Sequence, residues 1–223
     1  MTVDGAVAVI GQKIDPTTAV VEIDGVPLPM RPDLVYYLLY KPPGVISTAS
    51  DDRERQTVVD LVPAEPRVFP VGRLDADSEG LLLLTNDGEL TNLVTHPRFG
   101  VHKTYVAMVE GTLDRRTLRR LVTGVELEDG PVTAVSATVE AVFDDRTLVE
   151  VVMQEGRNRV VRRLLDALGH PVTRLVRTAI GPLRDRDLAP GAWRHLTLQE
   201  VRSLYSAAIG PWEDRPQSTK REE

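Results

Sequence analysis

The stretch VGRLDADSEGLLLLTNDGEL, residues 71–90, holds the densest group of chemically active side chains in the sequence. Three carboxylates, Asp75, Asp77 and Glu79, lie between two glycines, and the leucines at 81–84 follow directly. Glycine and aspartate favour turns, whereas a short apolar run bounded by turn residues is typical of a buried strand. We therefore expect a carboxylate-bearing loop that runs straight into a core strand.

Two simpler interpretations of this loop have to be weighed. A surface turn of solvated acids suits Asp77 and Glu79. A calcium loop fits the order Asp75-Ala-Asp77-Ser-Glu79-Gly80, but an EF-hand needs a bidentate glutamate at its twelfth position, where this chain has Asn86. We reject the calcium interpretation. The chain also lacks a phosphate-binding glycine loop, a nucleophile elbow and histidines at metal-ligand spacing, so we expect no cofactor and no metal.

Around this stretch the chain alternates irregularly between strand-like and helix-like segments. The strand-like segments are VFPV (68–71), GLLLLT (80–85), TYVAMVE (104–110), VTAVSATVEAVF (132–143) and TLVEVVM (147–153). A mixture without regular alternation of strand and helix favours an α+β fold with a mixed, largely antiparallel sheet and flanking helices.

Two segments carry helix signals. Asp114 can cap a helix over RRTLRRLVT (115–123), which Gly124 ends, with Leu118, Leu121 and Val122 on one face. The second predicted helix spans GRNRVVRRLLDALGH (156–170). Its valines and leucines form an inward stripe, and we expect its arginines 159, 162 and 163 to share another face.

Charge is divided between two adjoining blocks, although the whole chain has a net charge of −6. Residues 124–155 hold eight acids against Arg146, and residues 156–177 hold six arginines against Asp166. Clustered arginine is typical of phosphate contact, although a solvated helix face is the commoner explanation of an isolated cluster. If the arginine block does contact phosphate, we expect the acidic block to face elsewhere.

The composition excludes several classes of protein. The chain has no cysteine, which rules out disulfides, thiolate metal sites and a cysteine nucleophile. No apolar run is long enough to span a bilayer, and the first residues do not look like a signal peptide. We therefore expect a cytoplasmic protein with no membrane partner.

Several motifs together resemble one family, the bacterial ribosomal-RNA pseudouridine synthases that modify single uridines, and most closely its large-subunit branch. The matching segments are LLYKPPGVIST (38–48), residues 71–90, THPRFGVHKTYVAMVEG (95–111), EGRNRVVRRLLDALGH (155–170), LVRTAIGPL (175–183) and GAWRHLT (191–197). The resemblance implies a truncated S4-like RNA-binding module at 1–30, a catalytic domain at 31–205 and a polar tail at 206–223, for which we expect disorder.

The resemblance also implies roles for individual residues. Asp75, in Gly-Arg-Leu-Asp, would be the catalytic carboxylate, acting as a nucleophile or stabilising a sugar cation. Tyr105 would lie against the target uracil, although the pattern alone equally fits a core tyrosine. Arg162 would pair with Asp75 and keep it ionised, unless it only contacts phosphate as its neighbours would.

Further residues are expected to hold the RNA. Arg73 would fill the gap left by the flipped nucleotide, and Leu175 would form the apolar wall of the uracil pocket, or simply belong to the core. Val160 stands where the family usually has glutamine. The expected phosphate contacts are Lys103, Arg157, Arg159, Arg163 and Arg177.

The sequence thus predicts an isomerase that converts uridine to pseudouridine in ribosomal RNA, preferably of the large subunit, acting as a monomer. A non-catalytic RNA-binding ribosome-assembly factor on the same scaffold is the main alternative. A metal-dependent phosphodiesterase built on Asp75, Asp77 and Glu79 is a third hypothesis.

Overall fold

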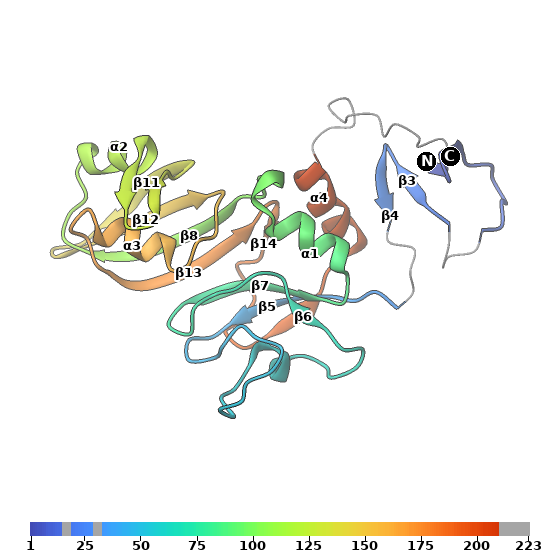
Figure 1. The fold of residues 1–223 in the computed structure, drawn as a ribbon, viewed down its shortest axis with the longest axis horizontal. Helices are drawn as coiled ribbons and strands as arrows, with labels where there is room; N and C mark the ends of the chain where they lie inside the picture. The colour runs from blue at the N-terminus through green and yellow to red at the C-terminus, as the bar shows by residue number, and fades with distance from the viewer. Residues whose placement is uncertain (15–18, 29–32, 210–223) are drawn as a thin grey trace.

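The computed structural model describes residues 1–14, 19–28 and 33–209, and one nine-stranded sheet forms its main body (Figure 1). The strand order is β11-β12-β8-β13-β7-β5-β15, with β14 beside β13 and β6 beside β7. Only β7 and β13 pair in parallel, so the predicted α+β fold with a largely antiparallel sheet is confirmed. The strands are β5 (Tyr36–Lys41), β6 (Phe69–Pro70), β7 (Glu79–Thr85), β8 (Lys103–Glu110), β11 (Ser136–Val142), β12 (Arg146–Met153), β13 (Val172–Ile180), β14 (Leu183–Arg184) and β15 (Trp193–His195).

The helices divide the main body into two halves with separate cores. Helices α2 (Arg115–Thr123) and α3 (Val160–Asp166) share one core with β8, β12 and β13. Helices α1 (Gly88–Thr95) and α4 (Leu198–Ile209) share another with β5 and β7. The leucines 81–84 of β7 are buried on both faces of the sheet, which is why this strand is uniformly apolar instead of alternating. The described residues also form 3-10 turns at Val58–Leu61 and Pro97–Phe99.

The two halves meet along the parallel pair β7–β13. The pairing covers only two positions on each strand, Glu79 opposite Val176 and Gly80 opposite Arg177. Gly80 has a φ of +109°, and a Cβ atom there would lie 2.6 Å from the backbone nitrogen of Arg177. Only glycine tolerates both this backbone conformation and this close approach. Gly80 therefore sets how closely the two halves meet.

The two predicted helices are both present, with differences. Helix α2 begins after Asp114, whose carboxylate accepts a hydrogen bond from the backbone of Thr117, and it ends at Gly124 as expected. Leu121 is buried, but Val122 is 42% exposed, so its predicted place on the inward face is wrong. Helix α3 is shorter than predicted, because Arg159 has a left-handed φ of 50° and lies before the helix begins.

Helices α1 and α4 were not predicted from the sequence. They are joined through Asp87, which caps α1 with one carboxylate oxygen. The other oxygen accepts hydrogen bonds from the hydroxyls of Tyr36 in β5 and Tyr205 in α4, at 2.7 and 2.8 Å. Helix α4 runs to Ile209, so the boundary predicted at residue 206 falls inside it, and the predicted disorder of 210–223 lies outside the described residues.

Two small sheets complete the fold. The N-terminal one has the order β2-β1-β3-β4, made of β1 (Thr2–Val3), β2 (Ala6–Val7), β3 (Val21–Ile23) and β4 (Val26–Leu28), and β4 lies against α4. Its S4-like character stays a prediction. The other is the hairpin β9 (Val125–Leu127) and β10 (Gly130–Val132), beyond α2. None of the helices in the described ranges is long and apolar enough to cross a membrane.

Candidate active site

The carboxylate loop, residues 71–78, joins β6 to β7 and is held from behind by the Lys41–Gly44 turn. The Lys41 side chain is fully buried, and its ammonium donates hydrogen bonds to the carbonyls of Pro42, Ala76 and Ser78 at 2.9, 3.4 and 2.7 Å. Burial lowers the pKa of Lys41 to about 8, against the opposing effect of three nearby carboxylates. The loop is therefore fixed by a buried cation as well as by its backbone.

A serine and a glycine add to this support. The Ser47 hydroxyl donates to the carbonyl of Leu74 at 2.8 Å and accepts from the Leu74 amide at 3.1 Å. The Gly44 amide donates to the carbonyl of Ala76 at 2.7 Å. These bonds bracket Asp75 on both sides, so its carboxylate has a defined position. We call residues 71–78 the loop wall.

A cavity of about 290 Å³ lies between the loop wall and the segment before α3. Asp75 is the one carboxylate among the described residues that line it. Tyr105 from β8 and Leu175 from β13 supply an aromatic and an apolar surface. The described lining residues also include a set of cations, Arg73, Lys103, Arg157, Arg159 and Arg177. The cavity thus combines one acid, one aromatic ring and an excess of positive charge.

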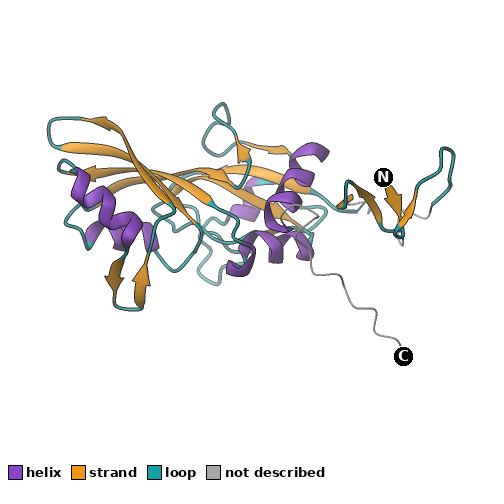
Figure 2. Ribbon diagram, turned by 90° about the horizontal axis from the view of Figure 1, so that it is seen from above, coloured by secondary structure: helices purple, strands orange, loops and turns teal. Residues whose placement is uncertain are grey.

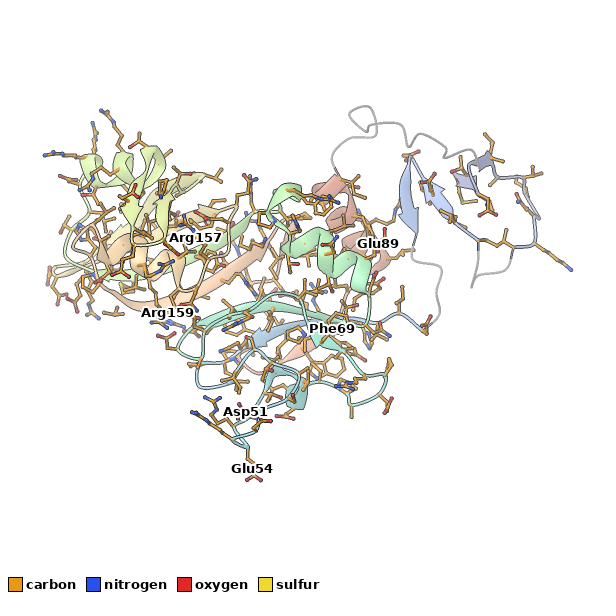
Figure 3. All side chains as sticks on the ribbon, in the orientation of Figure 1. Asp51, Glu54, Phe69, Glu89, Arg157 and Arg159 are labelled. Carbon is orange, nitrogen blue, oxygen red and sulfur yellow. The ribbon has the colours of Figure 1, made fainter. Side chains whose placement is uncertain are left out.

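Residues 156–161, which we call the arginine wall, face the loop wall across the cavity. The guanidinium of Arg159 binds both oxygens of Asp77, at 3.0 and 2.8 Å, and lies 3.9 Å from Asp75. Figure 3 labels the two arginines of this wall, Arg157 and Arg159. Its hydrogen bonds hold the pKa of Asp77 below its usual range. Arg157 pairs with Glu155 at 2.7 Å and with Asp129 at 3.2 Å. The arginine wall is therefore joined to its surroundings by ion pairs.

These pairs contradict the prediction that the acidic block faces away from the arginine block. Asp129, at the tip of the β9–β10 hairpin, binds both Arg157 and Arg163. Glu155 ends the acidic block and pairs with Arg157 two residues later. Two of the eight acids therefore lie against the arginine block, and Asp129 does so because the hairpin folds back over the segment before α3.

Arg162 does not pair with Asp75 in this structure, contrary to the prediction. One terminal nitrogen donates to the carbonyl of Val172 at 2.9 Å, and the other to the carbonyl of Asp77 at 2.9 Å. Its nearest carboxylate is that of Asp77, at 3.5 Å from Nε. Arg159 is instead the cation closest to Asp75, since the left-handed turn at Arg159 directs it toward the loop wall.

Arg177 and Lys103, two of the expected phosphate contacts, lie in the wall of the cavity. Arg177 is only 4% exposed; its Nε donates to the carbonyl of Leu81 at 2.7 Å, and one terminal nitrogen has no partner. Lys103 donates to the carbonyl of Val94 at 2.9 Å, and burial, aided by the charge of Arg177, lowers its pKa to about 8. Both cations lie in the cavity wall and not on the surface.

Eight of the ten predicted site residues line the cavity, and Arg162 and Arg163 do not. Val160, in place of the usual glutamine, lines it with a buried apolar side chain. The sequence did not identify Lys41 and Ser47 as supports of the loop wall. The available signal was Lys41 itself. It directly follows the apolar run 34–40, so its side chain begins beside a buried strand.

The other two loop carboxylates do not share a site with Asp75. Glu79 is 8% exposed rather than solvated; Arg174 binds it at 2.6 Å and Tyr40 at 3.2 Å. These partners, Arg174 first, hold the pKa of Glu79 below its usual range. Asp77 is bound to Arg159. In the part of the chain that the structure describes, no group of three acidic or histidine side chains could hold a metal ion.

The chain is similar to known RNA-modifying proteins over this whole region. The family model of RNA pseudouridylate synthases matches residues 35–167, which include both walls of the cavity. An uncharacterized RNA pseudouridine synthase of Mycobacterium leprae (strain TN) is 47% identical over 208 residues, 91% of this chain and 81% of that protein. Ribosomal large subunit pseudouridine synthase B of Bacillus subtilis (strain 168) is 42% identical over 191 residues, 84% of this chain and 78% of that protein.

A solved structure supports the same assignment. The crystal structure of a pseudouridylate synthase superimposes with a TM-score of 0.69 at 27% identity, covering 91% of this chain and 87% of that one. Two further solved structures share the fold alone. They are the archaeal box H/ACA sRNP Nop10-Cbf5 complex, at 18% identity, and a Cbf5-Nop10-Gar1 complex, at 17% identity. With the family model, these similarities establish that the chain belongs to the RNA pseudouridylate synthases.

Proposed function

We propose that this chain isomerises a uridine of large-subunit (23S) ribosomal RNA to pseudouridine, as a monomer, with Asp75 as the catalytic carboxylate. The observation that carries the proposal is the position of Asp75, the single carboxylate lining a cavity whose other charged lining residues are cations. The name of the Bacillus subtilis relative supports the large-subunit substrate.

The reaction moves one bond and one proton. The bond from ribose C1′ to uracil N1 breaks, the ring rotates, and a bond from C1′ to C5 forms. The proton on C5 is released and N1 gains a proton, so the atoms balance without a further reactant. Asp75 assists either as a nucleophile on the sugar or the ring, or as a fixed negative charge beside a sugar cation.

The remaining cavity residues suit a flipped uridine. Tyr105 offers a ring face to an unstacked base, and Leu175 closes the apolar side of the pocket. Arg159 and Lys103 place positive charge where the nucleotide phosphates would lie.

Release of tritium from C5-labelled 23S rRNA transcribed in vitro tests the proposal. The wild type should release tritium, and Asp75→Asn should lower the rate by about a thousandfold or more, because the reacting group is lost. Asp144→Asn, which removes an exposed carboxylate far along the chain, is the matched control and should keep the wild-type rate.

Three results would contradict parts of the proposal. A wild type that binds the transcript without releasing tritium would identify a non-catalytic RNA-binding factor. Substantial activity in Asp75→Asn would remove Asp75 from the reaction. Pseudouridine that appears in small-subunit but not in large-subunit transcripts would overturn the choice of substrate.

A further inference from the structure

The arginines before and within α3 leave little free charge for RNA beyond the target nucleotide. Arg157 and Arg163 are both occupied by Asp129, and Arg159 is occupied by Asp77. The cavity itself holds about 290 Å³, which suits a single nucleotide. An enzyme acting on a long RNA needs further backbone contacts to fix its position, and cations that no carboxylate binds supply them without breaking an ion pair.

Helix α2 carries such cations. Its four arginines, Arg115, Arg116, Arg119 and Arg120, are all exposed. None of these side chains makes an ion pair or a hydrogen bond with the described residues. The nearest acid in sequence, Asp114, is used to cap the helix through the backbone of Thr117. The four guanidinium groups of α2 are therefore exposed and form no ion pair or hydrogen bond within the described part of the chain, although the charge of Arg116 acts on Asp114.

The spacing of these residues gathers them on one face. Positions 115 and 119, and likewise 116 and 120, are one helical turn apart, so their Cβ atoms are about 6 Å from each other. Leu121 lies on the opposite side of α2, fully buried, and Leu118 packs against the same core. We call the four exposed residues the α2 arginine face.

This arrangement is unfavourable for the helix itself. Like charges one turn apart repel each other, at a cost of about 0.2–0.5 kcal/mol per pair. Arg115 and Arg116 also lie in the first turn, where the helix dipole favours anions over cations. Arg120 lies in the last turn, where the dipole favours a cation, but Arg115 and Arg116 and the two like-charge pairs oppose helix formation. A binding role explains their presence better than a structural one.

The α2 arginine face belongs to the cavity's half of the sheet. Helices α2 and α3 pack on one shared core, which also receives Tyr105, Ala107 and Val109 from β8. Figure 1 shows α2 and α3 together at one end of the molecule, and Figure 2 shows the helices of this end on a single side of the sheet. An RNA strand that extends from the cavity past α3 toward this end of the molecule would reach α2.

We propose that the α2 arginine face binds the phosphate backbone of the RNA substrate outside the target nucleotide, as a second contact region. This inference rests on the proposed function. If the substrate is RNA, the ligand of the α2 arginine face is phosphate and not an acidic protein surface. Such contacts raise affinity and fix register without reading sequence. The α2 arginine face would thus position the RNA, while the cavity selects and converts the uridine.

The test replaces all four arginines of α2 with glutamine and measures filter binding of a 23S rRNA transcript at several salt concentrations. We expect at least tenfold weaker binding at low salt, and a salt dependence reduced by about three in its logarithmic slope, since each lost phosphate contact removes about 0.7–0.9. The matched control changes four other exposed arginines, Arg53, Arg67, Arg184 and Arg186, to glutamine, with the same change in net charge.

Further variants and measurements separate the possible outcomes. Replacing the four arginines of α2 with lysine should restore most of the affinity, because phosphate contact depends on charge. Equal losses in the α2 and control variants, or no rescue by lysine, would overturn the inference, as would binding of an acidic protein but not RNA. Unfolding in urea checks that the variants fold. Tritium release by the wild type tests the proposed function on its own. A wild type that releases no tritium contradicts the proposed function, whereas an α2 variant with unchanged RNA affinity contradicts this inference.

Discussion

The two walls of the cavity are held in opposite ways. The loop wall is fixed by hydrogen bonds from the fully buried Lys41 and the half-buried Ser47, among others. The arginine wall is fixed by ion pairs to Asp77 and Asp129, whose side chains are 49% and 44% exposed. Buried bonds are insensitive to salt, whereas exposed ion pairs are weakened by it and contribute little to stability.

This difference matches what each wall has to do. The reacting carboxylate on the loop wall needs a fixed position, because small displacements of a catalytic group are costly. The cations of the arginine wall need to exchange a protein carboxylate for an RNA phosphate. Exposed pairs allow that exchange at low cost. Substitutions that affect the two walls should therefore differ in how much they change stability and RNA binding.

Lys41→Met should have the largest effect on stability. It leaves three carbonyls of the loop region without their buried donor, at about 1–3 kcal/mol each, partly offset because no ammonium has to be buried. We expect the free energy of unfolding to fall by about 2–4 kcal/mol, measured in urea, with kcat reduced more than KM. Lys13→Met, at an exposed position, is the control, and an unchanged urea midpoint for Lys41→Met would show that the loop wall is held by its backbone alone.

Glu79→Gln should have an intermediate effect, of about 1 kcal/mol, since Arg174 is 65% exposed and solvent screens the pair. The pKa of Glu79 is lowered in the folded protein, so its ion pair stabilises the fold at neutral pH. That contribution is lost as the pH falls below the unfolded value of about 4.5 toward the lower folded pKa.

The unfolding free energies of the wild type and Glu79→Gln should therefore differ near pH 7 and converge in acid. Urea titrations at a series of pH values measure this. A difference between the two proteins that stays constant down to the acid end would show that Glu79 contributes by packing instead of by charge.

Asp129→Asn should have the smallest effect on stability, within about 0.5 kcal/mol, because both ion pairs of Asp129 are exposed. It should nevertheless strengthen RNA binding several-fold and steepen the salt dependence, because Arg163 loses its carboxylate partner and Arg157 keeps only Glu155. Filter binding measures both. Asp144→Asn makes the same charge change at an exposed carboxylate that forms no ion pair with the described residues, and an equal gain in that variant would mean that net charge alone is responsible.

The fold class and most of the cavity could be predicted from the sequence, because motifs that lie on adjoining strands come together whatever the details. The four leucines of β7 predicted a strand, and the structure adds that both of its faces are buried. The sequence could not predict that Arg159, and not Arg162, lies closest to Asp75. That difference depends on the left-handed backbone of Arg159, which shortens α3. Likewise, periodicity gives no indication that Asp129 returns to Arg157, since that contact depends on how the β9–β10 hairpin folds back.

The short pairing of β7 with β13 at Gly80 means that catalysis depends on the assembly of the two halves of the sheet. Asp75 comes from one half of the sheet, and Tyr105, Leu175 and the arginine wall come from the other, so neither half holds a reaction centre by itself. Each half has its own core and can retain secondary structure when the two-residue pairing opens. Activity therefore reports on docking of the halves, and as denaturant is added it should disappear before the circular dichroism of the strands and helices does.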